Sequence, residues 1–297
     1  MSMFSIGLSG LNAAQNALNT TSNNISNVYT PGYNRELTLL GEQQSAGGGV
    51  QVNDIQRQFD HYVADQLNAA GSKSSALQSY QTQVSQIDNL LADQDAGLAP
   101  LMQDFFSSLE DLASSPSDPA ARQGVIGAAD TLSAQFRSFD GYLRDMQSGI
   151  DSNIRDEITQ INNSADQIAN LNREIALAKA KTGKAPNGLL NQRDQLVAEL
   201  NERVDVRLTI QESGTYNLSI GNGQPIVAGT RSFSLEAMSS SADPTRTVVG
   251  YNDSAGNQVE LDEDAITGGA LGGLLTFRSE TLRSEERRVG KECPLLC

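Results

Sequence analysis

The stretch from Pro119 to about Lys179 constrains the fold most, because its apolar residues recur in steps of four and three. The series is Val125, Ala129, Leu132, Phe136, Phe139, Leu143, Met146, Ile150, Ile154, Ile158, Ile161, Ala165 and Ile168. Such spacing places one apolar stripe along a single helix. At 1.5 Å per residue the helix would be about 90 Å long. A helix of this length needs neighbouring helices to cover its stripe.

Two further segments are expected to be those neighbours. A second helix is predicted from Asp54 to Leu91, and a return helix from Leu189 to Val204 follows a turn at residues 183–188. The predicted seam of the second helix consists of Val63, Ala70, Leu77, Tyr80, Val84, Ile87 and Leu91. The three segments together predict an antiparallel helical bundle.

A shorter helix is predicted from Leu98 to Leu112, closed by residues 114–116. Asp118 is expected to cap the long helix, with Pro119 in its first turn. Phe105, Phe106, Phe136 and Phe139 fall at helical spacing, so we expect them to pack in the core.

From Val204 the apolar period changes to two, which predicts antiparallel strands as far as about residue 262, with turns at 213–214 and 221–223. Residues 35–53 alternate weakly around Gly47–Gly49, which indicates an extended or β-like excursion with a flexible turn. The fold class is therefore α+β: a long antiparallel α-helical bundle or coiled coil, followed by an antiparallel β domain that is incomplete. The expected divisions are 1–34 (terminal heptad helix), 35–203 (helical bundle), 204–270 (β domain), 271–282 (start of a return helix) and 283–297 (tail).

The amino-terminal helix is the sharpest candidate for a contact surface. Phe4, Leu8, Leu11, Leu18 and Ile25 form a narrow seam, and the opposite face carries no charge before Arg35. The residues Thr30-Pro31-Gly32-Tyr33 then end the helix. One interpretation packs this helix on its own domain. We favour a repeated contact between molecules, because a face without charges is a poor solvated surface.

Composition and charge exclude several classes of partner. The 297 residues hold 21 Lys plus Arg against 36 Asp plus Glu, for a net charge of −15. Binding to a phosphate backbone would have to overcome that charge, so nucleic acid is excluded as the expected partner. No run of about 18 apolar residues is present, and the first 27 residues lack the pattern of a secretory signal. Neither a membrane span nor a cleaved signal peptide is expected.

No catalytic, cofactor or metal site is predicted. His61 is the only histidine and both cysteines, Cys293 and Cys297, lie in the last five residues, so zinc, haem and Cys-His sites have too few ligands. Asp262–Asp264 lacks the spacing of a calcium loop and is interpreted as a charged β-edge. Gly268–Gly273 lacks the Lys-Ser or Lys-Thr of a phosphate loop and is interpreted as a flexible hinge. An enzyme with a small-molecule substrate is therefore the weakest hypothesis.

The last fifteen residues, 283–297, are set apart from the fold. The sequence from Arg283 to Cys293 resembles the translated read-through of a sequencing adapter, so we expect this tail to be foreign.

Three stretches carry a family resemblance. Residues 8–35, from Leu-Ser-Gly-Leu-Asn-Ala-Ala-Gln-Asn-Ala-Leu through Ser-Asn-Asn-Ile-Ser-Asn to Thr-Pro-Gly-Tyr-Asn-Arg, resemble the amino-terminal signature of flagellar rod, hook and hook-associated proteins. The stretches Leu189–Leu200 and Gly268–Leu282 narrow the resemblance to the hook-associated protein 1 family, the first junction proteins between hook and filament. Tyr29 departs from the Asn usual before Thr-Pro-Gly-Tyr. Family members continue well beyond residue 282, so the chain is expected to be truncated.

The resemblance implies a non-enzymatic structural subunit that is exported by the flagellar type III apparatus and lies outside the cell. Its implied partners are other copies of itself in a ring, the flagellar hook protein, the second junction protein and an export chaperone. The interaction residues carried over by the resemblance are Phe4, Leu8, Leu11, Leu18, Ile25, Asn27, Pro31, Gly32 and Tyr33. Two alternatives stay open: another axial protein of hook or rod type, and a secreted coiled-coil binding module or adhesin.

Overall fold

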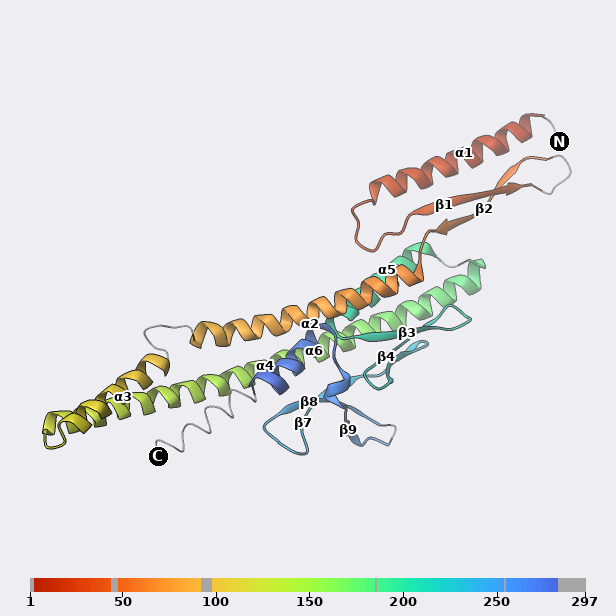
Figure 1. The fold of residues 1–297 in the computed structure, drawn as a ribbon. Coiled ribbons are helices and arrows are strands. Elements are labelled where there is room, and N and C mark those ends of the chain that lie inside the picture. Colours follow the sequence, from red (N-terminus) through yellow and green to blue (C-terminus); the bar gives the residue numbers. More distant parts are fainter. Residues whose placement is uncertain (1–2, 44–47, 92–97, 185, 254, 283–297) are drawn as a thin grey trace.

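The fold is described from a computed structural model, which describes residues 3–43, 48–91, 98–184, 186–253 and 255–282. The molecule is elongated, and one helix, α4, runs along most of its length (Figure 1). The helices are α1 (Met3–Ser26), α2 (His61–Leu91), α3 (Leu98–Ser114), α4 (Pro119–Thr182), α5 (Asn187–Arg203) and α6 (Gly269–Thr276), and a π-helical turn (Phe277–Leu282) follows α6. The strands are β1 (Glu36–Glu42), β2 (Val50–Arg57), β3 (Val206–Ile210), β4 (Tyr216–Ile220), β5 (Gln224–Ala228), β6 (Arg231–Ser232), β7 (Leu235–Ser239), β8 (Thr247–Asn252) and β9 (Gln258–Glu260). The predicted α+β class is confirmed.

The long helix α4 forms as the sequence predicts. Its 64 residues begin after Asp118, whose side chain accepts a hydrogen bond from the Ala120 amide at 2.9 Å, with Pro119 at the first position. It ends at Gly183, which takes a left-handed conformation with φ +73°. The stripe from Leu132 to Ile168 is buried. The apolar period and the two caps therefore account for both the extent and the packing face of α4.

The second helix begins later than predicted. Residues 54–57 belong to β2, where Asp54 pairs with Leu39 and Arg57 with Glu36 in an antiparallel hairpin with β1. Helix α2 starts only at His61, after Asp60 accepts hydrogen bonds from the amides of the first turn. The hairpin is the β-like excursion expected at 35–53, extended by four residues on the side of α2.

The predicted seam of α2 is wrong in its first half. Val63 and Leu77 are 57% and 61% exposed, whereas the buried positions are Ser72, Ala76, Gln83 and Ile87. The buried face therefore follows mostly small or polar residues in steps of about four. The reason lies in the partner, because α2 packs against α6 and α6 is rich in glycine.

The predicted flexible hinge at Gly268–Gly273 is also wrong. Gly269 to Gly273 lie within α6, and a Cβ at Gly273 would stand 2.2 Å from the Ala76 carbonyl oxygen of α2. A Cβ at Gly268 would stand 2.4 Å from the Ser72 hydroxyl oxygen. Gly273 therefore permits the close approach of two helix backbones, and Gly268 the close approach of the Ser72 side chain; neither position is explained by flexibility.

The strands after α5 form two antiparallel sheets, of order β3-β4-β5-β6 and β7-β8-β9. Both sheets lie along α4 (Figure 1) and contribute to the same hydrophobic core. The expected charged β-edge at Asp262–Asp264 is wrong, because Glu263–Ala265 forms a 3-10 turn and Glu263 accepts ion pairs from Arg246 and Arg278.

The aromatic residues expected in the core divide between core and surface. Phe136 and Phe139 on α4 are buried, each 4% exposed. Phe106 on α3 is 59% exposed, so its assignment to the core is wrong. Among the described elements, α4 is the main neighbour of α3, and one neighbour can cover only one side of a helix.

Candidate interaction surface

The polar face of α1 packs on the hairpin of the same chain. The Thr38 hydroxyl donates to the Thr20 hydroxyl at 2.8 Å. The Asn24 side-chain amide donates to the Glu36 carbonyl and accepts from the Glu36 amide, each at 2.8 Å. Near the other end of the helix, the Val50 amide donates to the Ser9 hydroxyl at 3.1 Å. The uncharged face is thus used within the molecule, as the interpretation of a helix packed on its own domain would have it.

The apolar stripe of α1 lies on the opposite side. At 100° per residue, Leu11 points about 160° away from the buried Ala13, and Leu18 about 160° away from the buried Thr20. The exposed fractions of the stripe are 80% for Phe4, 48% for Leu8, 65% for Leu11, 69% for Leu18 and 69% for Ile25. The chain therefore presents a continuous apolar stripe to solvent over the whole length of α1.

The remaining expected interaction residues form the turn after α1 and do not extend the stripe. The Asn27 side chain donates to the Asn23 carbonyl and accepts from the Thr30 hydroxyl, and the Tyr33 hydroxyl donates to Asn24 at 2.9 Å. Burial and the neighbouring Glu36 raise the pKa of Tyr33 above its ordinary value.

Two residues of this turn differ in their surroundings. Pro31 is exposed, whereas Gly32 has φ +74° and approaches α5 so closely that a Cβ would stand 2.8 Å from the Gln195 Cβ. The nine residues therefore separate into a solvent-facing stripe and a turn that borders α5.

Sequence reasoning missed the residues that hold this turn and the hairpin onto α5. Arg57 of β2 forms an ion pair with Asp194 and donates to Asn191 at 3.2 Å, and Asn34 donates to the same Asn191 oxygen at 2.9 Å. The side chains of Arg57 and Asp194 are each only 10% exposed. The available signal was the stretch Leu189–Leu200, which carried the family resemblance and was predicted only as part of the return helix.

Asp194 also contacts β4, on the side away from Arg57. The Tyr216 hydroxyl donates to Asp194 at 2.7 Å, and the Arg193 guanidinium lies 3.4 Å over the Tyr216 ring. Burial, followed by the nearby charge of Asp194, raises the pKa of Tyr216 to about 12. Burial lowers the pKa of Arg193, and Tyr216 and Asp194 oppose that effect. We call Asn34, Arg57, Asn191, Arg193, Asp194 and Tyr216 the anchor cluster.

A second buried ionic group ties the π-helical turn to the long helix. Arg278 is 2% exposed and donates to Asp151 of α4 at 2.9 Å, to Glu263 at 2.6 Å and to the Thr247 carbonyl at 2.5 Å. Its buried ion pairs give Arg278 a structural role within the stretch Leu274–Glu280. The stretches Leu189–Leu200 and Gly268–Leu282, two of the three that carry the resemblance, thus each contribute to a structural joint.

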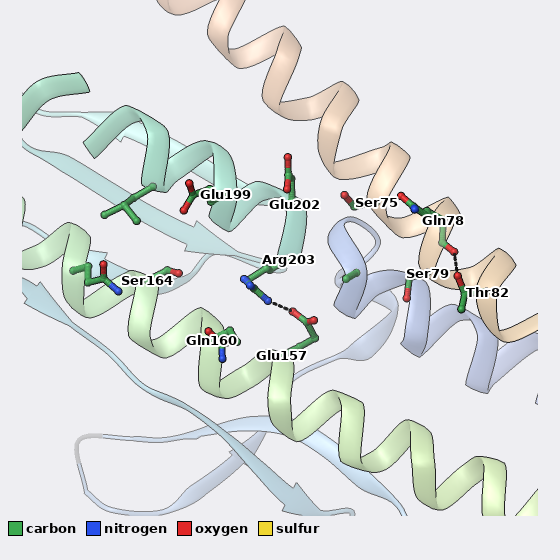
Figure 2. Close-up of a pocket in the computed structure, with 13 residues that line it drawn as sticks. Ser75, Gln78, Ser79, Thr82, Glu157, Gln160, Ser164, Glu199, Glu202 and Arg203 are labelled. Carbon is green, nitrogen blue, oxygen red and sulfur yellow. Dashed lines mark hydrogen bonds and ion pairs between the residues drawn. The ribbon is translucent and has the colours of Figure 1, made fainter. Parts of the chain in front are cut away.

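A groove of about 550 Å³ lies between α2, α4, α5 and α6 (Figure 2). Its lining is mostly Ser, Gln and Glu side chains, and Arg203 points to Glu157, with which it forms an ion pair at 3.1 Å. The lining contains no histidine, cysteine or lysine. The ion pair joins α5 to α4, and its groups are thereby engaged in holding the helices together.

His61 and the acidic side chains show no arrangement for metal binding in the described part of the chain. His61 is an exposed residue at the first position of α2, with its ring at an edge-on distance of 4.7 Å from Phe59. Among the residues that the structure describes, no group of three or more His, Cys, Asp or Glu side chains could hold a metal ion. None of the described helices combines the length and apolar character needed to cross a membrane.

Comparisons with known proteins decide the family. The family model described as "Flagellar hook-associated protein FlgK helical domain" matches residues 84–292. The chain belongs to the FlgK family. A second family model, "Flagella basal body rod protein", matches residues 4–34, which contain α1 and the turn after it. The FlgK match ends inside 283–297, a segment outside the described residues, and the expectation of a foreign tail stays a prediction.

Relatives within the FlgK family cover nearly the whole chain. Flagellar hook-associated protein 1 of Salmonella typhimurium is 46% identical over 98% of this chain, and that of Escherichia coli is 44% identical over 98%. The flagellar hook junction protein FlgK from Burkholderia pseudomallei has a similar solved structure, with a TM-score of 0.67, 36% identity, and coverage of 73% of this chain and 39% of that one. The chain spans about half the length of the curated relatives, 54% in both enterobacterial cases.

Proposed function

We propose that the protein is a structural, non-enzymatic subunit of the bacterial flagellum that joins hook to filament. Membership of the FlgK family supports the flagellar role. The observation that carries the mechanism is the exposed stripe of α1, because five large apolar side chains at heptad spacing are typical of a helix that pairs with another helix.

In this proposal the stripe (Phe4, Leu8, Leu11, Leu18 and Ile25) packs against helices outside the described chain, including a carboxy-terminal helix of the full-length protein. Neighbouring copies then form a ring that contacts the hook protein on one side and the second junction protein on the other. Before assembly the exposed stripe needs protection from aggregation, which is the role assigned to an export chaperone. Export through the flagellar apparatus places the subunit outside the cell.

The turn residues have a different role in the same proposal. Asn27, Pro31, Gly32 and Tyr33 form the turn that fixes the direction in which α1 leaves the rest of the molecule. Asn27 and Tyr33 hydrogen bond back to α1, and Gly32 lies close to Gln195 of α5. They position the stripe without forming part of it.

The test is incorporation at the hook tip in cells that lack the endogenous junction protein. A full-length protein with Leu11→Asp and Leu18→Asp should be exported but should fail to support filament growth, because two charges lie in the seam. The matched control carries Asn12→Asp and Asn19→Asp, which add the same two charges seven residues apart on an exposed side face of α1. Normal filaments on the Leu11/Leu18 variant would refute the proposal, provided that the control variant also assembles.

A further inference from the structure

The segment from Met3 to Arg57, which contains α1, β1 and β2, forms a body with no share in the main hydrophobic core. We call it the terminal unit. The described members of that core come from α2, α4, α5, α6 and the strands from β3 onward, and none precedes residue 80. Of the described elements, β1 and β2 are those on which α1 packs to any substantial extent. In Figure 1 the terminal unit lies at one end of the molecule, beyond the starts of α2 and α5.

Polar contacts at two places join the terminal unit to the rest of the molecule, and the Asn187 side chain of α5 also donates to the Ile55 carbonyl at 2.8 Å. One group belongs to the anchor cluster, where Arg57 and Asn34 meet Asp194 and Asn191. A second group lies at the turn between α4 and α5, where Lys184 forms an ion pair with Asp54 at 3.0 Å. The Lys184 and Asp54 side chains are 57% and 47% exposed, so solvent screens this second pair strongly.

The binding site for Arg57 belongs entirely to the rest of the molecule. Asp194 receives the Tyr216 hydroxyl, and Arg193 is fixed over the Tyr216 ring and donates to Asn172 of α4 at 3.0 Å. The Tyr216 hydroxyl is protonated throughout the neutral range and remains a donor to Asp194. The carboxylate that Arg57 binds is therefore already oriented by residues of α4, α5 and β4.

A cavity adjoins this joint on the side of the turn after α1. Its volume is about 220 Å³, and its lining includes Tyr33, Phe59, Leu67, Asp194 and Tyr216. The turn and the start of α2 are thus incompletely packed against α5 and the strands. Space of this size next to a polar joint allows the turn to move without breaking a packed core.

We infer that the buried ion pair between Arg57 and Asp194 is a latch that sets the angle of the terminal unit. When the pair is closed, the stripe of α1 points in one direction relative to α4. When the pair opens, the unit pivots about the turn and about residues 58–60. This inference takes its purpose from the proposed function, since a fixed angle presents the stripe to the helices that cover it, but it concerns the isolated chain.

The experiment measures the angle directly as a distance distribution. Spin labels are placed on Asn19→Cys of α1 and Asn153→Cys of α4, both exposed, in a chain whose own thiols are removed by Cys293→Ser and Cys297→Ser. Double electron–electron resonance on this labelled parent should give one narrow distance. A broad distribution in the parent would overturn the inference.

The variants separate the latch from the exposed pair. Arg57→Gln removes the cation without touching the binding site, and Asp194→Asn removes the carboxylate charge; both should broaden the distribution and shift its mean. Asp54→Asn removes only the exposed pair with Lys184 and should leave the distribution narrow. An unchanged distribution in Arg57→Gln, with helicity by circular dichroism equal to that of the parent, would overturn the inference even if Asp194→Asn failed to fold.

Salt gives an independent discrimination between the two pairs. In about 1 M NaCl the Debye length is about 3 Å, so exposed charges are screened whereas the buried Arg57–Asp194 pair is screened much less. The parent distribution should therefore stay narrow at high salt. Broadening by salt would assign the joint to Lys184 and Asp54 and would overturn the latch. Failure of the latch leaves the hook-tip result with the Leu11/Leu18 variant unaffected, so the two proposals fail separately.

Discussion

Replacing Gly273 by Ala tests the contact that organises the helical part of the molecule. A Cβ at this position would lie 2.2 Å from the Ala76 carbonyl oxygen and 2.9 Å from the Ser79 Cβ, both on α2. Because it belongs to the helix backbone, the Ala76 carbonyl cannot rotate away from the added Cβ. Helices α2 and α6 must therefore move apart, which loosens the packing of the buried Leu274 and Leu275 between them and the core.

The size of the effect follows from two opposing contributions. An Ala in place of Gly within a helix stabilises by about 0.5–1 kcal/mol, because the unfolded chain loses freedom. Inserting a methyl group into a packed contact costs about 1–3 kcal/mol, and more where backbone must move. The clash with backbone places Gly273 at the upper end of that cost, so after the helix gain we expect the variant to lose roughly 2–2.5 kcal/mol of unfolding free energy.

The assay is urea and thermal unfolding of the chain, followed by circular dichroism of its helices. For a domain of this size a change of about 1 kcal/mol shifts the Tm by about 2–4 °C. The matched control is Gly71→Ala, also in a helix of this contact region, where an added Cβ meets nothing within 4 Å. The control should gain about 0.5–1 kcal/mol. If Gly273→Ala were as stable as Gly71→Ala, the close approach of α6 to α2 would be refuted.

Four further outcomes follow from single side chains. Asp151→Asn leaves the Arg278 charge with only one buried carboxylate and should lower the unfolding free energy by up to about 3 kcal/mol in urea titrations. Asp118→Ala removes the cap of α4 and should cost about 1 kcal/mol, measured as a lower Tm. Leu18→Asp, at a 69% exposed position, should change the stability of the isolated chain by less than about 0.5 kcal/mol. The raised pKa of Tyr216 means that the folded state holds the phenolic proton more tightly than the unfolded chain does. The stabilisation of the fold by this group is therefore complete below pH 10.0 and is lost as the pH rises to about 12. Tyrosinate absorbance should show one late-titrating group that is absent in Tyr216→Phe.

The parts of the fold that could be predicted are those determined by signals that span only a few consecutive residues. Helix α4 has a single apolar period, a capping Asp118 and a terminal Gly183, and each of these signals acts over a few residues. The turns at Gly214 and Gly221–Gly223 are local in the same sense, since these glycines have positive φ. Strands β3 and β4 accordingly appear where the period of two begins.

The face of α2 could not be predicted, because it depends on a partner 200 residues away in the chain. A heptad reading favours the large residues Val63 and Leu77, whereas the observed face uses Ser72 and Ala76 to admit α6. The sequence shows glycines at 268–273 and small residues on α2, but nothing in either segment alone says that they meet. Flexibility was inferred there from composition, and close packing has the same composition.

The anchor cluster was missed for a related reason. Arg57 and Asp194 are 137 residues apart, and each is an ordinary charged residue in a chain with many. Neither an apolar period nor a turn signal marks a long-range ion pair. The stripe of α1 was predictable in its spacing and is exposed in the structure, while the hairpin that covers the opposite face was predicted only as a vague extended segment.

The way α1 is oriented argues for its role more strongly than its spacing does. Burying a Leu or Phe side chain stabilises a fold by about 1.5–3 kcal/mol, whereas a typical internal hydrogen bond contributes about 1 kcal/mol net. A helix selected only to stabilise its own chain would turn Leu11 and Leu18 toward the hairpin and leave Thr20 and Asn24 in water. Here the polar face is bonded to the hairpin and the apolar face is left in water. The orientation sacrifices stability in the isolated chain, and that sacrifice has a physical explanation if the stripe is buried by other helices in the assembled state.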